Sequence, residues 1–278
     1  MKQKRIVTIQ DLSCFGKCSL TVAHPIMSAM GLEVCPVPTA VLSTHTGGFK
    51  GWTFRDLSAD LPAIAAHWKR EGLTFDGIST GYLGSAEMIG MTADYFRLFP
   101  EAVKIVDPVF ADNGKLYAGF TEEYAAGMAE LCGQADVIVP NLTEASFMLG
   151  QEYVASGYDE AYIRDVLRRL AAFGCRVAAV TGVNYDGAHQ GVVAYDGTSG
   201  EFFQYFRENI DVSFHGTGDV FTSALAGAVV LGKPLEDALR IAVDYTVECI
   251  RATMPDRKEH WYGVKFETCL PGLIQSLA

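Results

Sequence analysis

Short, nearly continuous apolar runs alternate with longer amphipathic stretches along most of this chain, and this alternation restricts the possible folds most strongly. The runs have the length of strands, and their lack of polar interruptions is typical of strands buried on both faces of a parallel sheet. The expected strands are residues 5–10, 33–41, 77–80, 103–107, 137–140 and 177–181. The expected helices are residues 19–30, 57–71, 87–99, 122–132, 144–149 and 160–173. Alternating strands and helices predict an α/β fold whose helices cover a mostly parallel sheet.

The pattern changes in the last third of the chain. Residues 190–195 and 201–207 have strand character and flank a Gly-containing turn, which predicts an antiparallel hairpin at one edge of the sheet. Helices are expected at 217–231 and 235–253, since the intervening residues include a Gly that ends helices and a Pro that begins them. A last helix is expected at 266–276. One domain over residues 1–278 is the simplest interpretation.

The charge balance argues against two classes of partner. The 278 residues include 22 Lys and Arg against 33 Asp and Glu, a net charge of −11. Neither nucleic-acid binding nor binding to an anionic membrane is expected, because both need a basic face. Phosphate ligands remain compatible, because main-chain amides and bound cations hold phosphate locally.

The apolar segments are too short for targeting or for membrane insertion. Residues 6–9 are shorter than a signal-peptide core, and residues 220–231, the longest mostly apolar stretch, fall short of a membrane span. The seven cysteines are scattered, and the closest pair, Cys14 and Cys18, has no second pair beside it. We therefore expect reduced thiols in a cytoplasmic protein, with a zinc site as the alternative.

Polar residues follow each of the expected parallel strands. Ligands of open α/β sheets bind beyond the carboxyl ends of the strands, so these residues locate the site before any family is considered. They are Gln10-Asp11, residues 43–48, Thr80-Gly81-Tyr82, Asp107-Pro108, Pro140-Asn141 and Thr181-Gly182.

The sharpest local motif is His215-Gly216-Thr217-Gly218-Asp219, which opens the most apolar helix of the chain. Two glycines allow main-chain amides to turn toward one point, where the helix dipole also favours an anion. If that anion is a phosphoryl group in transfer, Asp219 can take the proton of an attacking hydroxyl. The alternative is that Asp219 only caps the helix.

Three further segments each allow a functional and a structural interpretation. Glu144 could hold a hydrated Mg²⁺, or it could complete a capping box with Asn141. Asp107 and Asp112 could be metal ligands, or solvated loop carboxylates. His45 could bond a heteroaromatic ring or a phosphate, or it could be a satisfied structural histidine.

Together these segments resemble the ribokinase-like superfamily and, within it, the pyridoxal/pyridoxamine kinases. The Gly-Thr-Gly-Asp motif marks the superfamily, and the segments around His45 and Tyr82 point to the vitamin B6 branch. The matching segments, in the family's order, are Ile9-Gln10, Ser43-Thr44-His45-Thr46, Gly81-Tyr82-Leu83-Gly84-Ser85, Asp107-Pro108-Val109, Asn141-Leu142-Thr143-Glu144 and Gly216-Thr217-Gly218-Asp219.

The resemblance implies a three-layer α/β/α ribokinase-like fold and ATP-dependent phosphorylation of the 5′-hydroxymethyl group of pyridoxamine, pyridoxal or pyridoxine. Asp219 would be the base, and the amides of Gly216, Thr217 and Gly218 would hold the phosphoryl group. The residues lining the vitamer pocket would be Asp11, Thr39, His45, Thr46 and Tyr82. The residues of the ATP site would be Asp107, Asp112, Asn141, Glu144, Thr181, Gly182 and His215. Glu144 and Asp107 would position Mg²⁺.

The same resemblance implies ATP as co-substrate, with K⁺ as a further cation and a homodimer as the common assembly. Two residues depart from the family's pattern: Asp11 stands where a serine that contacts the pyridine ring is usual, and Thr181 stands where some members carry a lysine. An acidic Asp11 would suit a protonated ring nitrogen or a cationic amine, which favours pyridoxamine.

Other functions remain open on the sequence. A hydroxymethylpyrimidine or sugar kinase of the same superfamily would share the motifs. The residues that suit a flat ring better than a sugar are Phe15, His45, Phe49, Trp52 and Tyr82. A non-catalytic vitamer-binding protein could keep the fold. A hydrolase is a further alternative, since residues 77–81 match the Gly-x-Ser-x-Gly nucleophile motif around Ser79.

Overall fold

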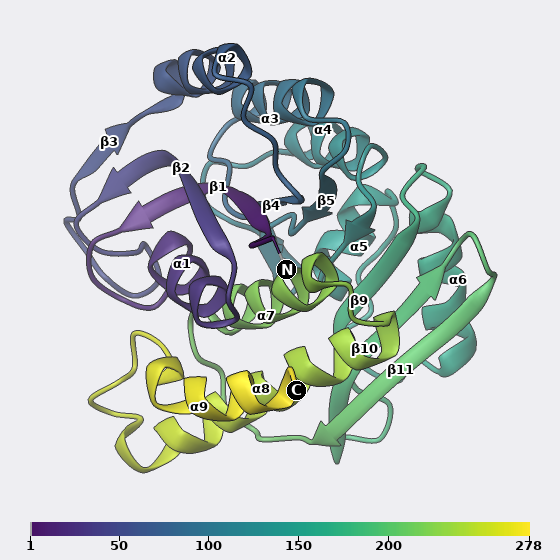
Figure 1. The fold of residues 1–278 in the computed structure, drawn as a ribbon. Coiled ribbons are helices and arrows are strands. Elements are labelled where there is room, and N and C mark those ends of the chain that lie inside the picture. The colour runs from purple at the N-terminus through teal and green to yellow at the C-terminus, as the bar shows by residue number, and fades with distance from the viewer. Residues whose placement is uncertain (1) are drawn as a thin grey trace.

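A twisted, mostly parallel sheet forms the centre of the computed structural model, which describes residues 2–278 (Figure 1). The strands lie in the order β11-β10-β9-β8-β5-β4-β1-β2-β3. Their bounds are β1 (Arg5–Ser13), β2 (Glu33–Leu42), β3 (Phe54–Asp56), β4 (Gly77–Thr80), β5 (Val103–Val106), β8 (Val137–Ile138), β9 (Val177–Val183), β10 (His189–Asp196) and β11 (Glu201–Glu208). The six strands from β9 to β2 are parallel, and β10 and β11 form the expected antiparallel hairpin.

Helices cover both faces of this sheet, so the predicted three-layer α/β/α fold is confirmed. One layer consists of α2 (Leu61–Arg70), α3 (Ala86–Leu98), α4 (Glu122–Cys132), α5 (Leu142–Met148) and α6 (Glu160–Ala171). The other layer consists of α1 (Leu20–Ala29), α7 (Thr217–Leu231), α8 (Leu235–Thr253) and α9 (Phe266–Ser276). No helix among residues 2–278 is both long and apolar enough to cross a membrane.

Successive strand residues serve the two layers in turn. Ile105 packs into the core on the α1 and α7 side, and its neighbour Val106 packs into the core beneath α3 and α4. The most deeply buried helix is α7, which approaches the sheet so closely that a β-carbon at Gly77 would lie 2.4 Å from a methyl group of Val230. This packing fixes the N-terminus of α7 beside the carboxyl ends of the strands.

The second sheet edge differs from the expectation. Residues 54–56 form β3, which pairs antiparallel with β2, so the hairpin is not the only antiparallel part of the sheet. A separate pair, β6 (Ala111–Asp112) and β7 (Lys115–Leu116), follows β5. All three residues of β3 are exposed, so the segment has none of the apolar alternation by which a strand is recognised in a sequence. Tertiary pairing forms these short strands, not local preference.

Candidate active site

The turn before α7 contains two glycines and requires glycine at the first of them. Gly216 is the N-cap of the helix and has a left-handed conformation with φ of 77°, and a β-carbon there would lie 1.7 Å from the carbonyl oxygen of Lys17. At Gly218 a β-carbon would meet nothing within 4 Å, so this side of the turn is open. No side chain caps the helix, which leaves its first amides available to an anion, the function predicted for Gly216, Thr217 and Gly218.

Asp219 lies in the first turn of α7 and does not cap it, so the capping alternative for this residue is wrong. The residue as a whole is partly exposed. Burial is the main cause that raises its pKa to about 8, and the charge of Asp107 raises it further, while a main-chain hydrogen bond from Ser19 opposes the rise. A carboxyl group with this pKa can exchange a proton near neutral pH, as a general base must.

Asp107 follows β5 and is buried at 7% exposure. Thr222 on α7 donates a 2.6 Å hydrogen bond to its Oδ2 atom, and the Val109 amide donates a second. Val109 has φ of 45°, a left-handed conformation that is costly for a β-branched residue and is typical of functional loops. Desolvation raises the pKa of Asp107 in spite of both hydrogen bonds.

Glu144 caps main-chain groups from two segments. Together with Asn141 it forms a full capping box at the start of α5. Its two carboxylate oxygens accept hydrogen bonds from the amides of Asn141 (2.9 Å) and Phe110 (3.1 Å). Burial raises its pKa well above the usual range, and the charge of Asp107 raises it further. The capping interpretation of Glu144 is therefore confirmed, whereas its function at a metal stays a prediction.

The carboxylates of Asp107, Glu144 and Asp219 form an acidic cluster. Glu144 and Asp219 both interact electrostatically with Asp107. Desolvation is the main cause of the raised pKa values of all three carboxyl groups, and no Lys, Arg or His of residues 2–278 is among the causes that lower them. Among residues 2–278, no group of three or more His, Cys, Asp or Glu side chains could hold a metal ion, which also leaves the zinc alternative without support. An open set of oxygen donors fits Mg²⁺, which keeps several waters and binds phosphate oxygens beside one or two carboxylates.

Asp11 lies beside this cluster, at the end of β1. Its carboxylate is buried and accepts hydrogen bonds from the hydroxyls of Ser13 (3.0 Å) and Ser19 (2.5 Å). Because the amide of Ser19 also reaches Asp219, Ser19 connects the two carboxylates. Ser19 has φ of 54°, a conformation that aims its amide and hydroxyl toward different partners.

Tyr82 is the other predicted vitamer residue near Asp11. Burial raises the pKa of its hydroxyl, and the charge of Asp11 raises it further. The Tyr82 ring lies 5.5 Å from that of Phe120, and its carbonyl oxygen accepts a long hydrogen bond from Thr39. Thr39 is buried, so it supports the main chain at Tyr82.

His45 is held by main-chain groups on both sides of its ring. Nδ1 accepts from the amide of Gly47 at 3.1 Å, and Nε2 lies 2.8 Å from the carbonyl oxygen of Tyr262. Such contacts are typical of a satisfied structural histidine, so a vitamer contact by His45 stays a prediction. The ring of His215 lies 5.3 Å away, and both His215 and Thr46 are exposed.

The remaining predicted ATP residues lie along neighbouring strand ends. Thr181 on β9 pairs with Asn141 through an isolated parallel bridge, and Gly182 follows with φ of 72°. Asp112 on β6 is exposed, and its carboxylate accepts from the amide and side chain of Asn113. The solvated-loop interpretation therefore describes Asp112 better than it describes Asp107.

Sequence reasoning missed Tyr117, Cys18 and Thr222. The Tyr117 hydroxyl has its pKa raised by burial first and then by four carboxylates, including those of Glu144 and Asp219. Burial likewise raises the pKa of the Cys18 thiol, followed by the charges of Asp219 and Asp11. Only the position of Thr222, one helical turn after Asp219, could have indicated a common face.

Ser79 does not support the hydrolase alternative. It lies inside β4, opposite Thr8 and Ile105, and is 1% exposed. A nucleophilic serine must stand on a sharp turn with its hydroxyl accessible. The hydrolase interpretation is therefore wrong.

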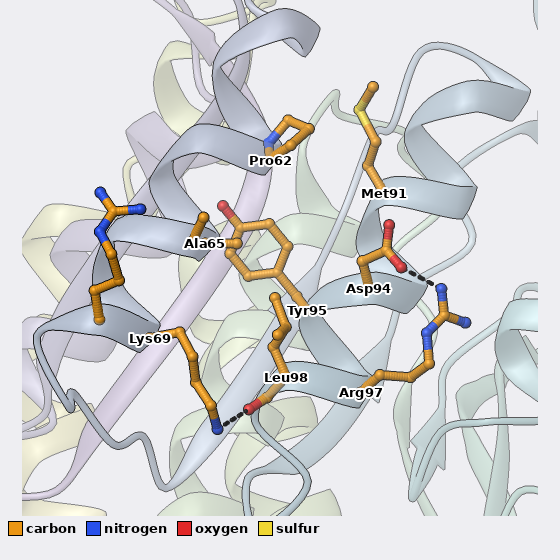
Figure 2. Close-up of a pocket in the computed structure, with 10 residues that line it drawn as sticks. Pro62, Ala65, Lys69, Met91, Asp94, Tyr95, Arg97 and Leu98 are labelled. Carbon is orange, nitrogen blue, oxygen red and sulfur yellow. Dashed lines mark hydrogen bonds and ion pairs between the residues drawn. The ribbon is translucent and has the colours of Figure 1, made fainter.

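A groove of about 480 Å³ between α2 and α3 contains none of the predicted site residues (Figure 2). The ion pair of Arg97 with Asp94 and the hydrogen bond from Lys69 to the Leu98 carbonyl occupy the charges along its rim. The hydroxyl of Tyr95 donates to the Leu61 carbonyl. Most polar groups of this groove thus have partners within the protein, whereas the acidic cluster has no cationic partner among residues 2–278.

The three-layer fold, with a Gly-Thr-Gly-Asp turn and an acidic cluster beside it, defines a kinase of the ribokinase-like superfamily. Residues 26–262 match the family of phosphomethylpyrimidine kinases, and the chain belongs to that family. Its relatives fall into two groups by substrate. The pyridoxine/pyridoxal/pyridoxamine kinase of Bordetella avium is 29% identical over 262 residues, covering 89% of this chain and 85% of that protein. The hydroxymethylpyrimidine/phosphomethylpyrimidine kinase of Mycobacterium leprae is 25% identical over 263 residues, covering 92% and 91%.

Solved structures show the same division. The pyridoxal kinase of Lactobacillus plantarum is 32% identical with a TM-score of 0.91, covering 99% of this chain and 98% of that one. A candidate phosphomethylpyrimidine kinase of Bacteroides thetaiotaomicron, crystallised with pyridoxal, is 38% identical with a TM-score of 0.92 and covers 98% and 96%.

Proposed function

We propose that this kinase transfers the γ-phosphoryl group of ATP to the 5′-hydroxymethyl group of a vitamin B6 vitamer. The observation that carries the proposal is the position of Asp219. This partly exposed residue stands in the first turn of α7, beside uncapped amides, and its carboxylate is within the electrostatic range of Asp11 and Asp107. A base, an anion site and an acidic substrate-side group are thus adjacent.

The chemistry follows from these positions. The hydroxymethyl oxygen attacks the γ-phosphorus and its proton passes to Asp219, while the bond from the γ-phosphorus to the bridging oxygen breaks and ADP leaves. The amides of Gly216, Thr217 and Gly218 stabilise the charge on the transferred group. Asp107 and Glu144 would hold Mg²⁺, which when bound neutralises phosphate charge. Thr181 and Gly182 would line the nucleotide phosphates.

The pyridine ring of the vitamer would lie between Asp11 and Tyr82. A buried carboxylate next to the ring favours a protonated ring nitrogen or an ammonium group, so pyridoxamine is the preferred vitamer in this proposal. The two serine hydroxyls that hold Asp11 keep its carboxylate fixed for such a contact.

A hydroxymethylpyrimidine kinase is the second candidate, since the family match and the Mycobacterium leprae relative favour it. Both substrates are flat heteroaromatic rings that carry a hydroxymethyl group, so the same base and anion site serve either reaction. A sugar kinase or a non-catalytic vitamer-binding protein lacks a comparable supporting observation.

The test is a substrate panel with coupled detection of ADP. Pyridoxamine, pyridoxal, pyridoxine, hydroxymethylpyrimidine and ribose are compared side by side, with Asp219→Asn as the inactive control. We expect kcat/KM to be highest for a B6 vitamer. A higher value for hydroxymethylpyrimidine selects the second candidate, and tight vitamer binding without ADP release by the wild-type protein rejects catalysis.

A further inference from the structure

One buried hydrogen bond joins the helix of the proposed base to the proposed metal carboxylate. The Oγ1 hydroxyl of Thr222 donates to Oδ2 of Asp107 over 2.6 Å, across 115 residues of sequence. Thr222 is 5% exposed and Asp107 is 7% exposed, so water does not compete effectively for either group.

The direction of this hydroxyl is unusual within the molecule. Helical threonines generally satisfy their hydroxyl on the carbonyl four residues earlier, as Thr92, Thr246 and Thr253 do here. Thr222 instead turns its hydroxyl away from its own helix toward β5. The bond therefore links two elements and is not local helix satisfaction.

The link matters because of where its two ends lie. Thr222 is one helical turn after Asp219, so the bond sets the separation of Asp107 from the base and from the anion-binding turn. Asp107 otherwise receives only the amide of Val109, from a turn with a costly left-handed conformation. Nearby, Glu144 and Asp219 repel the Asp107 carboxylate, so its orientation needs a fixed donor.

We propose that Thr222 is a positioning residue that orients Asp107 toward the metal-bound phosphates of the nucleotide. The inference rests on the proposed function, because it requires a Mg²⁺-nucleotide at this edge of the sheet. It adds a specific expectation. The Thr222 hydroxyl should increase the affinity for the Mg²⁺-bound nucleotide and have little effect on the affinity for the metal-free nucleotide.

The experiment is calorimetric titration of the folded protein with ADP, once with Mg²⁺ and once with EDTA, in the absence of any vitamer. Thr222→Val removes the hydroxyl and keeps the shape, and Thr222→Ser keeps the hydroxyl. Loss of a hydrogen bond to a charged group predicts about 10–100-fold weaker binding of MgADP by Thr222→Val. Binding of metal-free ADP should be unchanged, and Thr222→Ser should bind MgADP like the wild type. Thr92→Val is the matched control, because it removes another buried helical hydroxyl far from the site.

Two results with the variants overturn the inference. One is a Thr222→Val protein, or a Thr222→Ala protein should the valine variant not fold, that binds MgADP as tightly as the wild type. The other is a Thr222→Ser protein that loses as much affinity as Thr222→Val, which assigns the effect to packing. If the wild-type protein binds MgADP but phosphorylates no vitamer, the proposed substrate is wrong. The effect of Thr222 variants on MgADP binding can still be measured in that case. Absence of Mg²⁺-dependent ADP binding in the wild type overturns both.

Discussion

Asp107 and Asp196 are buried to nearly the same extent, at 7% and 6% exposure, yet their pKa values move in opposite directions. Asp196 ends β10, and burial by itself would raise its pKa. The amides of Thr198 and Ser199 and the guanidinium of Arg176 more than offset that effect, so the pKa is lowered. At Asp107 desolvation is the largest effect, and the hydrogen bonds from Thr222 and Val109 do not offset it, so its pKa is raised.

The difference distinguishes a carboxylate that the protein itself stabilises from one that we propose to be functional. Their exposed fractions do not distinguish them; how far hydrogen bonds and a neighbouring cation offset desolvation does. The carboxylate of Asp196 has a cationic partner, Arg176, whereas no Lys, Arg or His of residues 2–278 is among the groups that lower the pKa values of Asp107, Glu144 and Asp219. The predictions below test this contrast, beginning with the largest effect.

Asp219→Asn should abolish most catalysis. The amide cannot accept the substrate proton, so kcat should fall by about 10²–10⁴-fold with little change in KM. Steady-state kinetics with the best substrate of the panel measures both constants. Asp196→Asn is the matched control and should retain kcat. Near wild-type kcat in Asp219→Asn would remove this residue as the base.

Glu144 combines both halves of the contrast, since it caps main-chain amides and also has a raised pKa. Glu144→Gln keeps an acceptor oxygen for the cap and removes the charge, so the Mg²⁺ concentration for half-maximal activity should rise by about tenfold. Glu144→Ala should in addition lose about 1–2 kcal/mol of unfolding free energy, because the capping box is broken. A Mg²⁺ titration and chemical denaturation separate the two effects. If the titration of Glu144→Gln matches that of the wild type, Glu144 acts only as a cap.

The contrast should also appear in stability against pH. The folded-state pKa of Asp219 is about 8, against 3.8 for the unfolded chain, so the folded protein binds the extra proton and loses stability as pH rises between these values. Asp219→Asn removes this loss and should raise the Tm at pH 8 by about 2–4 °C per kcal/mol gained, with a smaller gain at pH 5. Calorimetry without nucleotide or Mg²⁺ measures it.

Asp196 should behave oppositely. Its pKa is lowered in the folded state, so its contribution is present above the unfolded-state pKa and is lost as pH falls through the folded-state value. Asp196→Asn should therefore cost about 1–3 kcal/mol at pH 7 and less in acid. Two variants that shift stability with the same sign at pH 8 would contradict the distinction between the two carboxylates.

The sequence predicts the long elements of the fold well, for physical reasons. The bounds expected for α4, α7, α8 and α9 agree with the structure, because apolar periodicity defines these helices locally. Gly232 and Pro234 also mark where α7 ends and α8 begins. The strands β3, β6 and β7 were not expected. They are two or three residues long and exist through pairing, which no local pattern records.

The site divides in the same way. The strand-end rule and the glycine turn locate Asp107 and Asp219 without coordinates. The partner of a side-chain hydroxyl cannot be predicted in this way. Thr222 and Asp107 are 115 residues apart, and the Thr222 hydroxyl could instead have donated to a carbonyl of its own helix. Tyr117, which follows β7, likewise comes within electrostatic range of the acidic cluster only through the tertiary fold.

The smallest predicted effect concerns the choice of vitamer. Burial raises the pKa of the Asp11 carboxyl group, as it does for Asp107. The hydroxyls of Ser13 and Ser19 donate hydrogen bonds to it, and no cationic side chain among residues 2–278 does. A cationic substrate group would complete this site as Arg176 helps to complete the site of Asp196. Asp11→Ser should therefore lower the ratio of kcat/KM for pyridoxamine to that for pyridoxal by about tenfold, the equivalent of one charge-assisted hydrogen bond. Ser13→Ala, which loosens the carboxylate without removing it, should lower the ratio less. A ratio that does not change in Asp11→Ser means that the carboxylate does not contact the distinguishing group, and pyridoxamine loses its place as the preferred vitamer.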